Sequence, residues 1–553
     1  MVACSLNRVI ETVRNTCERI IGVLLVIILI SPDSGALAQD NSIITHPVKK
    51  MSSNQGYTLL TSPPRFIFQD IRLSEFSDLP SSRSADIFLD QELSLKDNPQ
   101  KGRPVLNWET GSGKSYLIPA LEIPAFNLVM NSVARLAFPD STEDGKGTYD
   151  TNPSTFWDKL VHGSWQIDDD SFNTNQLMHP YQGAVYQNIA RSTGLSFWEA
   201  AGYTFVGSFL WVMGGETGEP SINDQIASGI AGNFLGEALF RTASLLLEHG
   251  EPGLWRELGA AVISPPTGIN RVSFGDRFKA VFPSYDPALF WRLRLGATWT
   301  IRTSGASSDE LERNEAVADF LLTYGLPGKP GYHYTRPFDY FELELTTGSN
   351  ADHLVENLMT RGLLFGKEYE FGNSYRGIWG LYGSYDYIAP NPFFRVSSTA
   401  LPIGTTSQWW LSRSVALQGS ILAGLGYGGG GNTTPAQGDR DFHYGVTVQS
   451  FIDLRLIFGD LAMLEATHRE YYISDVGSTA PSGSETIGHF NLGLTVRIHG
   501  PHALGIQYLL SSRDGDYDGM ANQSQRIAQV TFVYTLLSDN HFGAVEWRPV
   551  GNH

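Results

Sequence analysis

The second half of the chain alternates apolar and polar residues with a period of two. In Trp291–Ile301 every odd-numbered residue is apolar, and the even-numbered ones are arginine, threonine or glycine. In Phe490–Ile498 and Ala528–Tyr534 the even-numbered residues form the apolar set. Because successive side chains of a strand point to opposite faces, each segment predicts a β-strand with one apolar face. This pattern is typical of a transmembrane barrel, although a large soluble β-sandwich alternates in a similar way.

The connections between these strands alternate in length. Two are short, Gly459-Asp460 and His499–His502, and three are long and polar, namely Gly429–Arg440, Asp475–Ser484 and Asp514–Gln523. Short turns at one end and long loops at the other are typical of the periplasmic and outer ends of a barrel. Gly325–Arg336 breaks this rhythm, since it is long where a short turn is expected. We therefore predict an antiparallel barrel of about 12 strands over 286–538, followed by a tail at 539–553.

A helical spacing of apolar residues replaces the alternation in the preceding block, 151–285. Three helices are predicted, at Tyr181–Thr193, Phe197–Met213 and Ile222–Glu248, with room for a fourth. Ser196 is placed to cap the second helix, with Glu199 three residues later as in a capping box, and Ser221 is placed to cap the third. The fold class is thus α+β, an N-terminal helical block followed by an outer-membrane type of transmembrane barrel.

The N-terminus has the features of a secretory signal. Arg8, Arg14 and Arg19 precede the apolar run Ile20–Ile30, and Ala36-Leu37-Ala38 offers a cleavage site. We predict a signal peptide at 1–38 rather than a retained anchor, because eleven apolar residues are too few to span a core about 30 Å thick. The mature chain then lacks cysteine, since both cysteines lie in this segment. Residues 39–150 are rich in Ser, Pro, Asn and Asp and predict a loop-rich periplasmic leader, with order beginning near Tyr116.

Composition agrees with a barrel in the envelope. Charged residues make up 17% and aromatic residues 12% of the 553 residues, and there are 57 glycines. Such a chain suits a membrane barrel with aromatic girdles better than a soluble enzyme. The net charge of −18 argues against a nucleic acid partner, which needs a basic face. We expect the outer membrane or periplasm as the location, with outer-membrane lipid and the outer-membrane assembly machinery as partners.

Several short motifs in the helical block occur together. They are Asn175-x-x-x-His179-Pro180-Tyr181-x-Gly183, Arg191-Ser192-x-Gly194, Pro220-Ser221-x-Asn223-Asp224 and Gly236-Glu237. Over roughly residues 150–260 this block resembles a family of uncharacterised bacterial envelope proteins, known only as a domain of unknown function. The resemblance implies a Gram-negative envelope location and implies no activity.

Four polar residues in this block are candidate catalytic residues: His179, Glu199, Glu216 and Glu237. If they converge, together with Asp224, imidazole and carboxylates would suit metal binding or general acid–base hydrolysis. The alternative is structural. In that interpretation these groups cap helices and satisfy buried backbone, and Glu237 pairs with an arginine four residues later. The turn-like sequence before Pro180 places His179 at or next to a helix N-cap.

A second candidate site lies near the C-terminus. Asp514, Asp516 and Asp518 are spaced like the start of a calcium loop, with Gly519 allowing the turn. The twelfth position is Gln525, which lacks the usual bidentate carboxylate, so any calcium binding would be weak, and a solvated acidic hairpin tip is the favoured interpretation. No other cofactor is expected.

Two functions follow from these patterns. We favour a barrel without enzymatic activity, either structural or a small-solute pore, whose helical domain is periplasmic or plugs the lumen. The alternative is an envelope hydrolase acting on lipid or peptidoglycan, with its His/carboxylate site in the helical block.

Overall fold

The computed structural model describes most of the chain from residue 105 onward. The described ranges are 105–137, 147–168, 170–249, 253–305, 314–349, 354–390, 394–431, 442–476, 482–538 and 541–548. The predicted signal peptide and most of the predicted leader lie outside the described residues. The part of the leader that is described contains a helix that begins at Leu117, next to the predicted start of order near Tyr116.

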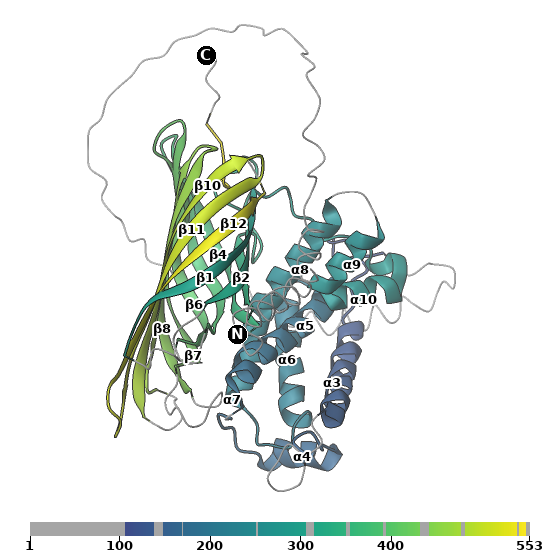
Figure 1. The fold of residues 1–553 in the computed structure, drawn as a ribbon. Coiled ribbons are helices and arrows are strands. Elements are labelled where there is room, and N and C mark those ends of the chain that lie inside the picture. The colour runs from purple at the N-terminus through teal and green to yellow at the C-terminus, as the bar shows by residue number, and fades with distance from the viewer. Residues whose placement is uncertain are drawn as a thin grey trace, which may run out of the picture. The chain divides into compact units, whose positions relative to one another are not determined.

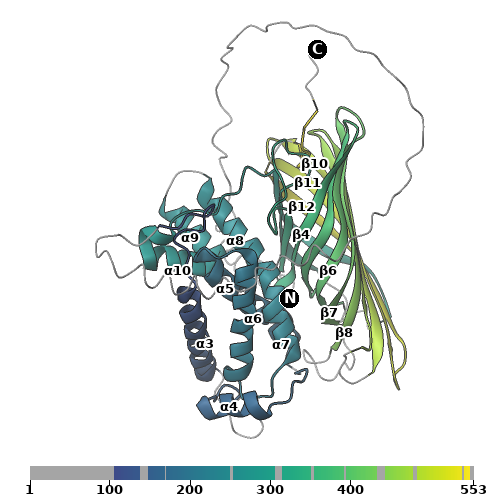
Figure 2. The same cartoon turned by 180° about the vertical axis from the view of Figure 1, so that it is seen from behind.

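Twelve strands form a closed antiparallel barrel (Figures 1 and 2). Their bounds are β1 (Leu289–Ser304), β2 (Asn314–Tyr324), β3 (Phe341–Gly348), β4 (Val355–Phe371), β5 (Tyr375–Ile388), β6 (Val396–Trp410), β7 (Val415–Gly430), β8 (His443–Phe458), β9 (Ala462–Ile473), β10 (Gly483–His499), β11 (His502–Tyr517) and β12 (Gln523–Leu537). Each strand pairs with its sequence neighbours, and β1 pairs with β12 to close the ring. The predicted fold class and strand number are confirmed.

The alternation sorts side chains between the two faces of the barrel wall as predicted. On the outward face Leu295 of β1 lies opposite Tyr534 of β12, and the rings of Trp299 and Phe532 meet edge to face at 5.9 Å. Arg294, on the other face of β1, is buried in the lumen with 1% of its surface exposed. The wall therefore has an apolar exterior and a polar interior, as in an outer-membrane barrel.

The strand connections follow the predicted rhythm with one correction. The turns 459–461 and 500–501 are short, and the connection 431–442 at the opposite end of the barrel is long. The prediction of a long loop from Asp514 is wrong, because β11 continues to Tyr517. The exceptional loop after β2, residues 325–340, is long because it carries side chains that contact the helical domain.

The described helices precede the barrel. They are α3 (Leu117–Ala137), α4 (Pro153–His162), α5 (His179–Ser192), α6 (Phe197–Gly214), α7 (Ile222–Ile226), α8 (Gly232–Glu248), α9 (Leu254–Ile263) and α10 (Pro265–Phe274), with π-helical turns at Thr174–Met178 and Ala227–Ala231. The block thus has more helices than the three or four predicted. Sequence reasoning missed α4, α9 and α10, which are only ten residues long each, although α4 has an Asn152 cap and Pro153 at its start and Gly163 at its end.

The predicted helix caps are largely confirmed. The Ser196 side chain accepts a hydrogen bond from the Glu199 backbone N–H, and Glu199 Oε2 accepts one from the Ser196 N–H at 2.7 Å. Ser221 caps α7 by accepting from the Asp224 N–H. The N-cap position predicted for His179 is wrong, because the π-helical turn before it is already helical and runs directly into α5.

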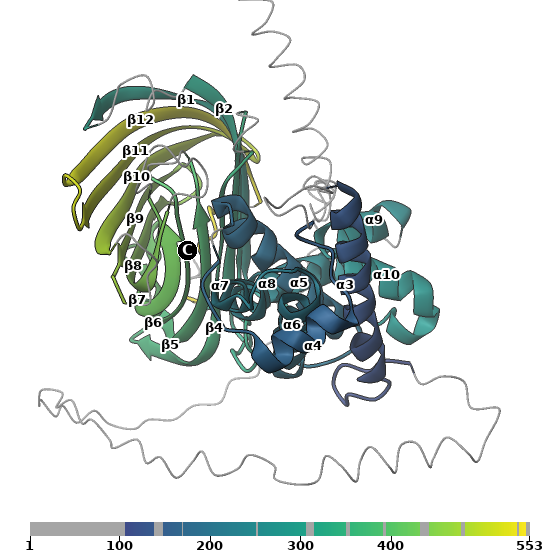
Figure 3. The same ribbon diagram turned by 90° about the horizontal axis from the view of Figure 1, so that it is seen from below.

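The helices lie outside the ring of strands. Gly383 of β5 lies between two residues that face the lumen, Tyr382 and Ser384, and its outward face meets the Phe234 ring of α8. Helix α8 also contacts β3 and β4. Figure 3, which looks along the strands, shows the helices beside β4 and outside the ring. The described helices therefore do not plug the lumen, and that part of the prediction is wrong.

Candidate functional site

His179 begins α5 and is buried with a carboxylate beside it. Its Nε2 atom lies 3.3 Å from Oδ1 of Asp224, and its Nδ1 atom lies 3.1 Å from Oε1 of Gln182. Both His179 and Asp224 are almost fully buried. The Nε2–Oδ1 contact suits an ion pair, but neither atom has a hydrogen-bond partner among the described residues.

Two more carboxylates lie around this pair. Burial raises the pKa of the Asp168 carboxyl, but hydrogen bonds from Ser221, Asn175 and Asn223 outweigh it and hold that pKa below its usual value. Burial also raises the pKa of the Glu216 carboxyl, although the nearby His179 opposes the rise. The cluster around His179 therefore combines Asp168, whose hydrogen bonds favour the ionised form, with Glu216, whose burial favours the neutral form.

This cluster joins the helical domain to the barrel. Tyr444 of β8 accepts hydrogen bonds from the Gln176 amide at 2.7 Å and from the Asn223 amide at 3.2 Å. Tyr385 of β5 donates to the Gln176 backbone carbonyl at 2.6 Å. The tyrosines face outward from the barrel wall and meet polar groups of the helices, so the cluster occupies an interface between two parts of the fold.

Glu199 and Glu237 lie elsewhere, so the four predicted catalytic residues do not form one site. Glu199 Oε1 accepts from Lys114 Nζ at 2.9 Å, next to its own helix cap. Glu237 is fully buried between Arg191 and Arg241. Only His179 and Glu216 come together, in company with Asp224. The structural alternative is confirmed for Glu199 as a cap and for Glu237, whose partner is the arginine four residues later.

The arginine cage around Glu237 is a second link to the barrel. Arg191 donates to Glu237 Oε2 at 2.7 Å, and Arg241 donates to Glu237 Oε1 at 2.9 Å. Arg241 also donates to Asp339 Oδ1, in the loop after β2, at 2.9 Å. Burial raises the pKa of the Asp339 carboxyl, but Arg241 and Arg336 hold it below its usual value. Sequence reasoning missed Asp339, which no local pattern connects with α8.

The predicted calcium site is not formed by its three aspartates. Asp514 and Asp516 lie in β11, and Asp518 is in the turn after it. All three are exposed, and alternate residues of a strand stand side by side without converging on one point. Among the residues that the structure describes, no group of His, Cys, Asp or Glu is arranged to hold a metal ion. The acidic hairpin remains as the structural interpretation.

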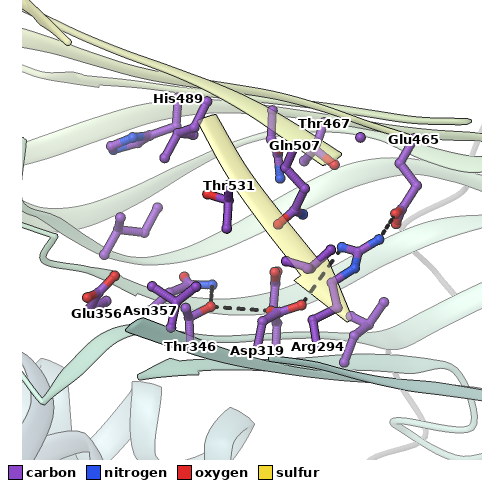
Figure 4. A pocket seen from close by; sticks show the side chains of 18 of the residues that line it. Arg294, Asp319, Thr346, Glu356, Asn357, Glu465, Thr467, His489, Gln507 and Thr531 are labelled. Carbon is purple, nitrogen blue, oxygen red and sulfur yellow. Dashed lines mark hydrogen bonds and ion pairs between the residues drawn. The ribbon is translucent and has the colours of Figure 1, made fainter. Parts of the chain in front are cut away.

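The lumen holds an ion-pair network that crosses it. Arg294 of β1 pairs with Glu465 of β9 and lies 3.9 Å from Asp319 of β2 (Figure 4). Arg469 of β9 donates to Glu344 of β3 at 2.8 Å. In a closed ring of twelve strands, β3 and β9 are six positions apart in either direction, so this last pair joins opposite walls.

A cavity of about 160 Å³ remains among these charges. Four arginines and six carboxylates line it: Arg292, Arg294, Arg455 and Arg469, with Asp319, Glu342, Glu344, Glu356, Asp453 and Glu465. Polar residues were expected on the lumen face, but their partners across the ring were not predicted.

Apolar side chains pack across the lumen on both sides of the network. Toward the long-loop end, Met359 of β4 packs in one cluster with Ile473 of β9 and Ile487 of β10. At the short-turn end, Phe542 and Val545 of the C-terminal tail are buried among lumen-facing residues. Gln408 Nε2 donates to the Val545 carbonyl at 2.7 Å, and Gln408 Oε1 accepts from its N–H at 2.8 Å. The tail therefore folds back over one mouth of the barrel.

Comparisons with known proteins find one family model and several solved structures that are similar to parts of this chain. Residues 164–266 match the family model of a domain of unknown function, DUF3943. No curated protein matches the chain. Among solved structures, the NanC porin is similar at 9% identity over 44% of this chain and 98% of that one, with a TM-score of 0.23.

Two further solved structures are similar over the barrel. An outer membrane channel from Pseudomonas putida F1 is 11% identical over 47% of this chain and 100% of its own, with a TM-score of 0.27. Outer membrane phospholipase A from Escherichia coli is 14% identical over 43% of this chain and 89% of its own, with a TM-score of 0.22. The chain combines a helical region that matches a domain of unknown function with a closed barrel of twelve antiparallel strands.

Proposed function

We propose that the barrel is a structural, non-conducting element of the outer membrane that anchors the helical domain. The observation that carries the proposal is the ion pair between Arg469 and Glu344, which joins opposite walls of the ring. Side chains that contact each other from opposite walls narrow the lumen at that level. A scaffold needs a rigid, filled interior, whereas a pore needs an open one.

The energy of the network supports the same proposal. Breaking a buried ion pair leaves an uncompensated charge at a cost of about 3–5 kcal/mol. The pairs Arg294–Glu465, Arg292–Glu465 and Arg469–Glu344 are of this kind and join strands that are not neighbours in the ring. Separating several of them would cost about as much as the 5–15 kcal/mol that stabilises a typical fold. Opening of the lumen by thermal motion is therefore expected to be rare.

A gated small-solute channel is the second candidate, and the C-terminal tail favours it. The tail is held at the mouth partly by hydrogen bonds from Gln408 and Gln418 rather than by a strand ladder. Each such bond contributes only about 0.5–1.5 kcal/mol, so the tail could be displaced more easily than the ion pairs. The charged cavity behind it would then meet solutes.

Planar-bilayer conductance separates these functions. We compare the full chain, a chain ending at residue 540, and the double variant Glu344→Ala/Arg469→Ala, with heat-modifiable gel mobility as the check that each barrel is folded. The scaffold predicts that the full chain and the shortened chain are silent, while the double variant conducts weakly because the cross-lumen pair is gone. Conductance by the folded shortened chain would favour the gated channel. A silent protein that turns over phospholipid or peptidoglycan would favour the hydrolase.

A further inference from the structure

Helix α3 has its polar and apolar faces reversed relative to a helix of a soluble protein. Its buried residues include Asn127 and Asn131, whose amides donate to the backbone carbonyls of Gly207 and Gly215 at 3.1 Å and 2.7 Å. Ile123 is also buried, but six large apolar residues face outward: Leu117, Leu121, Leu128, Val129, Val133 and Leu136. Leu136 is 86% exposed. In a soluble protein the apolar stripe would face the core.

The neighbouring helices α6, α9 and α10 repeat this reversal. In α6, Thr204 and Ser208 are buried, whereas Phe205 and Val206 are exposed. In α10 the buried residues include Asn270 and Arg271, and in α9 the exposed ones include Trp255. The exposed residues of α3, α6 and α10 are uncharged, and in α9 the Glu257 side chain, which is 44% exposed, pairs with Arg271. A contiguous apolar surface of this extent marks an interaction site with protein or membrane rather than a surface exposed to water.

The interior of the bundle is packed in the way that helices pack in lipid. Gly183 of α5 lies so close to the helix opposite that an added Cβ would fall 1.9 Å from the Ser228 carbonyl oxygen. Gly232 and Gly236 of α8, spaced four residues apart, face α5 at similarly close range. In lipid the hydrophobic effect does not drive helices together. Small residues at this spacing allow the helix backbones to approach closely, and hydrogen bonds between buried polar groups hold the helices together.

The dimensions of the apolar surface fit a bilayer. Helix α3 has 21 residues and is only 22% buried in its most apolar window, and it is about 31 Å long at 1.5 Å per residue. A bilayer core is about 30 Å thick. Exposed charges lie near the two ends of α3: Asp158 and His162 of α4 at one end, and Asp276 and Lys279 after α10 at the other.

The apolar surface continues onto the lipid-facing wall of the barrel. The Trp198 ring of α6 stacks on the Phe365 ring of β4 with centroids 5.3 Å apart, and both residues remain about half exposed. We propose that the helical domain lies within the hydrocarbon layer of the outer membrane beside β4, with lipid acyl chains covering α3, α6, α9 and α10. The occupant of this surface is lipid because the surface is continuous with the apolar exterior of the barrel. This inference does not depend on whether the lumen conducts.

Lipid quenching of single labelled cysteines tests the proposal. The background is Cys4→Ser/Cys17→Ser, in which no other cysteine is present. Leu128→Cys on α3 is compared with Leu494→Cys on the outward face of β10 and with Asp276→Cys, which is exposed at the end of the bundle. Each folded, heat-modifiable variant carries an environment-sensitive fluorophore. It is reconstituted in phosphatidylethanolamine–phosphatidylglycerol vesicles with or without acyl-chain nitroxide lipid.

The expected result is that label at position 128 is quenched about as strongly as label at 494, and about threefold more than label at 276, since only groups within the core meet the acyl-chain nitroxide. Quenching at 128 as weak as at 276, together with rapid labelling by a membrane-impermeant maleimide, would place the bundle in water and overturn the proposal. A position 128 that resists both the nitroxide and the maleimide would mean that protein covers α3, and this would overturn it as well.

Discussion

Replacing Glu237 with glutamine is the strongest test of how the helical domain is held together. Glu237 is fully buried and accepts three hydrogen bonds, two from Arg191 at 2.7 and 3.1 Å and one from Arg241 at 2.9 Å. Glutamine keeps the shape of the side chain but removes its negative charge. Its NH₂ group would also face a guanidinium, which has no acceptor.

The size of the effect follows from the cage. Leaving a buried arginine without its partner costs about 3–5 kcal/mol. Arg191 has partial compensation, because its guanidinium lies 4.5 Å from the Phe240 ring centroid and 4.8 Å from that of Phe282. A desolvated cation–π contact contributes about 2 kcal/mol. The contacts of Arg191 with the Phe240 and Phe282 rings are present both before and after the substitution. They hold the guanidinium in place but do not replace the lost negative charge of Glu237. We expect a loss of about 3 kcal/mol of unfolding free energy.

The assay is urea unfolding in detergent, followed by tryptophan fluorescence and by heat-modifiable mobility. Glu199→Gln is the matched control, since it is the same substitution on a neighbouring helix. Glu199 and its partner Lys114 are each 31% exposed at the side chain. Loss of the Glu199 charge weakens a surface ion pair worth about 0–1 kcal/mol and one of the two hydrogen bonds of a capping box. The unfolding free energy of this variant should therefore fall by about 1 kcal/mol. If the two variants unfold at the same urea concentration, the cage does not stabilise the domain and the reasoning is refuted.

Three further predictions use other parts of the structure. The folded pKa of Asp339 lies below its ordinary value, so the stability that Asp339 contributes is present at neutral pH and is lost as the pH falls below about 4. The rate of proteolysis of the loop after β2 should therefore be constant from pH 7 to about 4.5 and rise below that pH. A rise already at pH 6 would contradict this. His179→Ala should lower unfolding free energy by about 1–3 kcal/mol, because the buried Gln182 Oε1 loses its hydrogen-bond partner His179 Nδ1, and normal abundance and melting of the variant would refute the structural role. Calcium at millimolar levels should not change the melting of the protein, and a shift that disappears in Asp514→Asn/Asp516→Asn/Asp518→Asn would show that the hairpin binds the ion.

Local sequence patterns determined much of this architecture. Alternation along β1, β10 and β12 predicts which side chains face outward, because the strand geometry fixes that choice residue by residue. The caps at Ser196 and Ser221 and the pairing of Glu237 with Arg241 are equally local, since each joins residues within one helical turn. These features require no knowledge of the distant chain.

Tertiary structure alone decided how the candidate residues are used. Gln176 and Tyr444, which join the His179 cluster to the barrel, are 268 residues apart, and Arg469 and Glu344, which cross the lumen, are 125 apart. A periodic pattern assigns a residue to a face but carries no information about which distant residue it will meet. The reversed face of α3 was missed for a related reason. Apolar periodicity indicates an amphipathic helix, but whether its apolar stripe turns inward or outward depends on what surrounds it, and only packing against α5 and α6 resolves that.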